Sequence, residues 1–104
     1  EEATGTWIDG KTIYRYTWTG TKAVSASQPS MFTLPSTPDT VVNLRGIRKR
    51  AGGNQWAIPY AYYGNDNWDM GIYIDANNVV YVGAGSGYGS TVDTFIIVVE
   101  YTKA

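Results

Sequence analysis

Apolar and polar residues alternate along most of the chain, which is the period of a half-buried β-strand, and no window holds a sustained helical period. Gly, Pro, Asn, Ser and Thr interrupt this pattern at short intervals, as they do in sandwiches and barrels. The predicted strands are residues 12–19, 31–34, 40–49, 55–62, 70–75, 79–82 and 94–102. We therefore expect an all-β fold, an antiparallel β-sandwich of jelly-roll type with seven to eight short strands.

The turns between these strands carry their own signals. Residues 52–54 (Gly-Gly-Asn) predict a hairpin turn, and residues 76–78 (Ala-Asn-Asn) predict a second one. The polar, small residues 20–30 predict a long loop. Because Pro59 cannot donate a backbone hydrogen bond, its strand should be bulged there or lie at a sheet edge.

Residues 94–102 form the strongest predicted strand. One set of alternate side chains should face the core: Phe95, Ile97, Val99 and Tyr101. The other set is also mostly apolar: Ile96, Val98 and Glu100. A strand that is apolar on both faces is usually covered on both, so we expect a further strand or another subunit over the second face.

The 104 residues are enough for one domain, 1–104, with its own core. The chain has no Cys and no His, which excludes disulfides, thiolate metal sites and nucleophilic catalysis of the Ser-His-Asp or Cys-His kind. We expect no catalytic residues and no cofactor. The sequence given has no apolar run that could span a bilayer, and we expect no signal peptide. Its abrupt start at Glu1 suggests the C-terminal fragment of a longer protein.

The net charge of −1 offers no field for a nucleic acid backbone. One cationic run, Arg45, Arg48, Lys49 and Arg50, is interpreted as a solvated edge or rim. The aromatic content is high, with four Trp, nine Tyr and two Phe. Tyr and Trp combine an apolar body with a polar tip, which suits surfaces that contact partners. Since a core of this size needs fewer rings, several should lie on the surface, whereas Trp7 and Trp18 are expected in packing or subunit contacts.

Residues 60–69 form the most site-like segment. Aromatic rings can stack on the C–H face of a sugar while amides and carboxylates bond its hydroxyls, and binding residues concentrate in loops on rigid scaffolds. Tyr88 stands among glycines and should be an exposed ring. Tyr62 has the parity of Trp56 and Ile58 and is expected in the core. The predicted ligand-binding residues are Tyr63, Asn65, Asp66, Asn67, Trp68, Asp69 and Tyr88.

Three other kinds of site are less well supported by the sequence than a saccharide-binding loop. Asp66, Asp69 and Asp75 could supply the carboxylate pair of a glycosidase, but Asp in such turns usually bonds its own backbone. The oxygen ligands at 65–69 lack the glycine position and terminal Glu of an EF-hand, so they predict no metal site of that type, although a surface calcium stays open. The Gly-rich residues 83–89 are not followed by a helix or a Lys-Ser pair, which disfavours a phosphate loop.

Three segments, in order along the chain, carry a resemblance to a known family. The opening segment is Gly5-Thr6-Trp7-Ile8-Asp9-Gly10-Lys11, the middle segment is Asp39-Thr40-Val41-Val42-Asn43-Leu44-Arg45-Gly46, and the closing strand is Val99-Glu100-Tyr101-Thr102-Lys103. Together they resemble the C-terminal head domains of phage tail-fibre and baseplate receptor-binding proteins of Gram-positive bacteria, their prophages and phage-tail-like particles. That family usually has proline where this chain has Thr12.

The resemblance implies a homotrimeric head at the virion tail tip that binds a bacterial cell-surface glycan or another envelope receptor, with no nucleic acid partner and no membrane insertion. Linked weak sites in such a trimer would raise the apparent affinity. Two other functions fit the same residues. One is a monomeric carbohydrate-binding module appended to an enzyme, and the other is a structural cap without a ligand.

Overall fold

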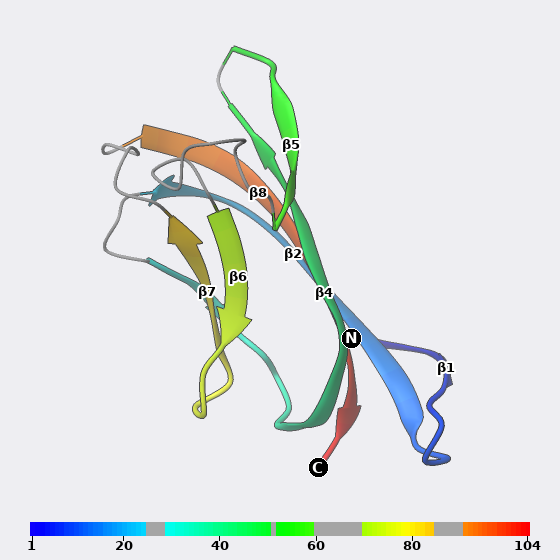
Figure 1. The fold of residues 1–104 in the computed structure, drawn as a ribbon. Coiled ribbons are helices and arrows are strands. Elements are labelled where there is room, and N and C mark those ends of the chain that lie inside the picture. Colours follow the sequence, from blue (N-terminus) through cyan, green and yellow to red (C-terminus); the bar gives the residue numbers. More distant parts are fainter. Residues whose placement is uncertain (25–28, 51, 60–69, 85–90) are drawn as a thin grey trace.

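The computed structural model describes residues 1–24, 29–50, 52–59, 70–84 and 91–104. These residues form eight antiparallel strands in two packed sheets, which confirms the predicted all-β sandwich (Figure 1). No helix in the described part of the chain is long and apolar enough to cross a membrane. The strands are β1 (Glu2–Thr6), β2 (Thr12–Val24), β3 (Ser30–Thr33), β4 (Pro38–Lys49), β5 (Gln55–Ile58), β6 (Met70–Ile74), β7 (Val79–Ala84) and β8 (Thr91–Lys103).

The larger sheet has the strand order β1-β2-β8-β4-β5, and the smaller sheet has the order β3-β7-β6. Strand β2 pairs with β8 in the first sheet, while β3, the next strand along the chain, pairs with β7 in the second. In each sheet, a strand from the first half of the chain therefore pairs with a strand from the last half. Figure 1 shows β6 and β7 lying to one side of the large sheet.

The core lies between the two sheets. The four β8 side chains predicted to face inward are fully buried, with an exposed fraction of 0%: Phe95, Ile97, Val99 and Tyr101. The small sheet contributes Met31, Met70, Val80 and Val82 from the other side. Burying these side chains is the main favourable term for the fold.

Strand β2 is longer than predicted, because it continues through residues 20–24 of the expected loop. These residues pair in register with the start of β8, from Gly20 opposite Phe95 onward. The hydroxyls of Thr21 and Thr94 lie 3.3 Å apart across this pair. Composition alone suggested a loop, but a long partner strand supplies the hydrogen bonds that extend the ladder.

The interpretation of Arg48 as part of a solvated rim is wrong. Strand β4 lies inside the sheet, between β8 and β5, and Arg48 points into the core side. Its Nε donates to Asp93 Oδ2 at 2.7 Å, and the two side chains are only 5% and 3% exposed. The guanidinium also lies 5.0 Å from the ring centroid of Trp56. A buried charge needs such partners. Arg45, Lys49 and Arg50 are exposed, as predicted.

Strand β5 is the edge strand that Pro59 predicted, and it ends at Ile58, directly before that proline. Residues 60–62 of the predicted strand, with Tyr62, lie outside the described residues. Trp18 packs as expected, since its ring stacks on Phe32 of the other sheet with centroids 5.3 Å apart. Gly20 lies beneath the same indole, because a Cβ there would come within 2.3 Å of Trp18 Cζ2.

Gly20→Ala should therefore lower the free energy of unfolding by about 1–3 kcal/mol, because the new methyl group must displace an indole that is stacked on Phe32. Urea denaturation measures this. The matched control is Gly71→Ala, where a Cβ would meet no atom within 4 Å, and which should change stability by less than about 0.5 kcal/mol. Equal stability of the two variants would contradict the packing described at Trp18.

Candidate functional site

All seven predicted ligand-binding residues lie outside the described residues: Tyr63, Asn65, Asp66, Asn67, Trp68, Asp69 and Tyr88. Their roles, and the open question of a surface calcium at 65–69, stay predictions. The candidate site is therefore built from the surfaces that the described strands present. There are two of these surfaces, the outer face of the small sheet and the outer face of the large sheet.

A pair of tyrosines dominates the outer face of the small sheet. Tyr73 of β6 pairs directly with Tyr81 of β7, and both point away from the core because Ile72 and Val82 point into it. The two rings are stacked, with centroids 5.0 Å apart and an interplanar angle of 14°. Tyr73 remains 43% exposed. This face thus presents a preformed aromatic surface to solvent.

The turn of the β6–β7 hairpin holds Tyr81 in place. Asp75 Oδ1 accepts hydrogen bonds from the backbone amides of Asn77 and Val79, at 2.9 and 3.0 Å, and Oδ2 accepts one from the Tyr81 hydroxyl at 3.0 Å. The Val79 amide, with help from Asn77 and Tyr81, holds the pKa of Asp75 below its ordinary value. The hydrogen bond from the Tyr81 hydroxyl to Asp75 raises the pKa of Tyr81. One carboxylate therefore fixes both the turn and the ring.

Sequence reasoning missed this tyrosine pair, although the signal was present. The hairpin of residues 70–75 and 79–82 was predicted, and Tyr73 and Tyr81 are equally distant from Asn77 at its centre. Residues placed symmetrically about a hairpin turn lie opposite each other in the ladder. The strands of the hairpin were predicted without their register, and it is the register that places the two rings opposite each other.

The outer face of the large sheet is the second surface. Its middle is apolar, with Ile96 and Val98 of β8 beside Ile47 of β4. Val92 at the start of β8 is 61% exposed. Strand β2 borders this stripe with three exposed threonines, at positions 17, 19 and 21. Among the described elements, β8 packs side by side with β2 and β4, and no strand lies over its outer face.

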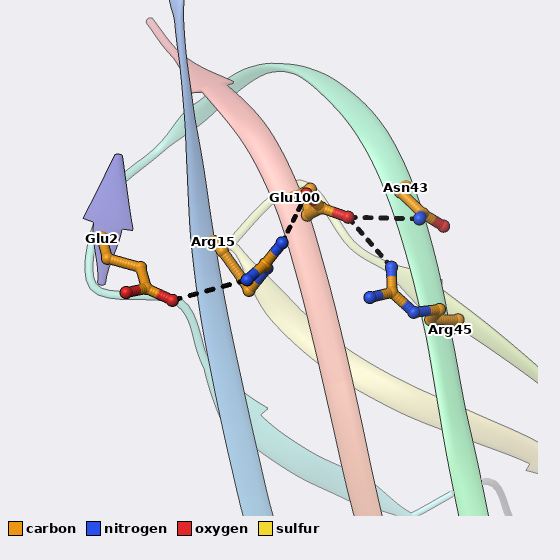
Figure 2. Close-up of polar contacts among 5 residues, drawn as sticks. All are labelled: Glu2, Arg15, Asn43, Arg45 and Glu100. Atoms are coloured by element: carbon orange, nitrogen blue, oxygen red, sulfur yellow. Dashed lines mark hydrogen bonds and ion pairs between the residues drawn. The ribbon is translucent and has the colours of Figure 1, made fainter. Parts of the chain in front are cut away.

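A polar network closes one end of this stripe and crosses four strands (Figure 2). Glu100 lies at its centre and accepts hydrogen bonds from Arg45 at 2.9 Å and Asn43 at 3.2 Å. Arg15 lies 3.6 Å from both Glu100 and Glu2. The hydrogen bond from Arg45 is the largest cause of the lowered pKa of Glu100, and Asn43 and Arg15 add to it.

The network leaves one donor unsatisfied. The Nε of Arg15 is buried and has no hydrogen-bond partner within the described ranges. A buried N–H without an acceptor is costly, so such a group is satisfied by water or by a partner where one is present. The Arg15 side chain as a whole is still 39% exposed, so this end of the face is able to accept a further contact.

Comparisons with protein-family models, with curated proteins and with solved structures found no match for this chain. Within the described residues, no three His, Cys, Asp or Glu side chains lie together where they could hold a metal ion. The function is accordingly argued from the two surfaces themselves.

The lowered pKa of Glu100 makes its ion pairs depend on pH. Its stabilising contribution should be present above the unfolded-state pKa and be lost as the pH falls through the folded-state value. Glu100→Gln should cost about 1 kcal/mol or less at pH 7, because both arginines are partly exposed, and the cost should vanish at acidic pH.

Thermal denaturation of both proteins from pH 7 down to pH 2 measures this difference. Subtracting the two curves is necessary because Glu1 and Asp75 also have lowered pKa values and also lose stabilising contacts in acid. A difference that stayed constant with pH would contradict the electrostatic role of Glu100.

Proposed function

We propose that this chain is a non-catalytic adhesion domain that works as a homotrimer and recognises a bacterial cell-surface saccharide, as the receptor-binding heads of phage tail fibres do. Such a head belongs at the tip of a virion tail. The proposal joins the resemblance of three ordered segments with two surfaces of the fold. The stacked tyrosines, of which Tyr73 is exposed, support saccharide recognition, and the outer face of the large sheet supports assembly.

The observation that carries the proposal is that β8 is apolar on both faces while the described strands cover only one of them. Strands of 12 and 13 residues reach about 40 Å, and three of them side by side present about 600 Å². With the neighbouring strands, this approaches the area of about 800 Å² that each partner gives to a standard interface. A second and third copy of the chain supply a covering of the right size.

The charged residues at the end of this face are arranged so that they can pair with the same residues of a second copy of the chain. Glu2 and Glu100 alternate with Arg15 and Arg45, so that a copy facing this band can set its carboxylates against these guanidiniums. Between this band and Lys49, which lies on the same face at the end of β4, the face carries threonine and β-branched aliphatic side chains that pack well on a flat sheet.

Wild-type protein at tens of micromolar should therefore have three times the 11.4 kDa mass of the chain in sedimentation equilibrium. Thr19→Lys places a charge beside the apolar stripe of the outer face and should reduce the mass to that of one chain, because a charge without a partner is costly to bury in an interface. Thr19 is exposed, so circular dichroism should show that the variant is folded.

The matched control is Thr33→Lys, the same change at an exposed position of the small sheet, which should leave the mass unchanged. A wild-type protein that is monomeric would contradict the proposed trimer and favour the monomeric carbohydrate-binding module. A trimer that survives Thr19→Lys would mean that the copies meet through another face.

Saccharide recognition is tested separately with an array of bacterial surface polysaccharides and teichoic acids. The protein is biotinylated and displayed on streptavidin, so that avidity does not depend on its own assembly. Binding to a subset of these glycans is expected. Failure to bind any glycan on the array would contradict the recognition half of the proposal and favour a structural cap.

A further inference from the structure

A pair of glycines lies next to the tyrosine pair on the same face of the small sheet. Gly71 of β6 pairs with Gly83 of β7, two residues along each strand from Tyr73 and Tyr81. Residues two apart in a strand share a face and lie about 7 Å apart. The rings therefore rise from the sheet beside a stretch that has no side chains.

The space above Gly71 is open. A Cβ built at this position would meet no atom within 4 Å, and the backbone there does not have the positive φ that only glycine adopts readily. Across the sheet, Tyr81 pairs with the small residue Ser30 of β3. The result is a step in the surface, with an aromatic wall on one side and the half-buried backbone of the glycine pair as its floor.

The electrostatics of this step favour a neutral ligand. None of the strands β3, β6 and β7 contains a charged residue. The nearest carboxylate in the described part of the chain, Asp75, already accepts three hydrogen bonds from its own hairpin. Among the described residues, a nucleotide or a charged peptide would find no partner here for its charge, whereas a sugar ring offers an apolar C–H face to stack on tyrosine and hydroxyls for backbone groups.

From this geometry we infer that Tyr73, Tyr81 and the Gly71–Gly83 pair form a binding subsite for a neutral pyranose residue of the receptor saccharide. The sugar stacks on the tyrosine wall and its edge lies over the glycine floor. The inference rests on the proposed saccharide recognition and locates it on the outer face of the β6–β7 hairpin. Asp75 is a positioning residue, because it touches the Tyr81 hydroxyl and not the sugar.

The glycine pair lies near the end of the β6–β7 hairpin from which, in sequence, the predicted binding segments continue. Met70 pairs with Ala84, and the chain continues from these two residues directly into 69 and 85. The glycine pair is the next rung of this hairpin. A saccharide longer than one residue that begins on the tyrosines can therefore extend along the hairpin toward this end of the sheet.

Two substitutions test the subsite on the streptavidin-displayed protein and the same glycan array. Tyr73→Ala removes the exposed part of the wall and should weaken binding at least about tenfold. Gly71→Val fills the open floor and should weaken binding to a similar extent. The valine has room, and a β-branched residue suits a strand, so the melting temperature should stay the same or rise.

Two controls accompany them. Tyr73→Phe keeps the ring and should retain binding. Gly5→Val introduces the same side chain at an exposed glycine of the large sheet that also has nothing within 4 Å, and it should bind as wild type does.

The outcomes separate this inference from the proposed function. Loss of binding in Tyr73→Ala and Gly71→Val, with both controls intact, supports the subsite. Wild-type affinity in those two variants overturns the subsite but leaves saccharide recognition standing. A wild-type protein that binds none of the glycans overturns both.

Discussion

The pairing of β8 with β2 on one side and β4 on the other is the constraint on which the rest of the structure depends. Because side chains alternate across a strand, this one strand commits Phe95, Ile97, Val99 and Tyr101 to the core and leaves Ile96 and Val98 on the opposite face. The small sheet must then bury its own apolar face against the first set. The polar network around Glu100 marks where the outer face stops being apolar.

This arrangement separates the two proposed activities in space. The small sheet can cover only one face of the large sheet, so its own outer face, with Tyr73 and Tyr81, is directed away from the outer face of β8. Copies that meet through β8 would therefore leave their tyrosine steps directed outward, away from the assembly axis. Several weak saccharide sites could then reach one cell surface together, which is the physical basis of avidity.

Local periodicity was enough to predict the fold class, the core side of β8 and the β6–β7 hairpin, since each depends on alternation within a few residues. Two of the failures involve partners that are distant in sequence. Arg48 shares the parity of Leu44, yet its charge suggested a rim, and its ion pair with Asp93, 45 residues away, helps to explain its burial. Residues 20–24 became strand because β8 extends opposite them. The tyrosine pair needed the hairpin register, and the predicted loop residues such as Trp68 lie outside the described part.

The central claim is that a rigid β-sandwich presents stacked tyrosine rings to a sugar. Its most direct test is NMR of protein carrying ¹³C-labelled tyrosine rings, titrated with a glycan that the wild-type protein binds. The account predicts that the ring signals of Tyr73 and Tyr81 shift with saturation, and that magnetisation transfers from those rings to the C–H protons of the sugar. Saturable binding that leaves both ring signals unmoved would contradict it.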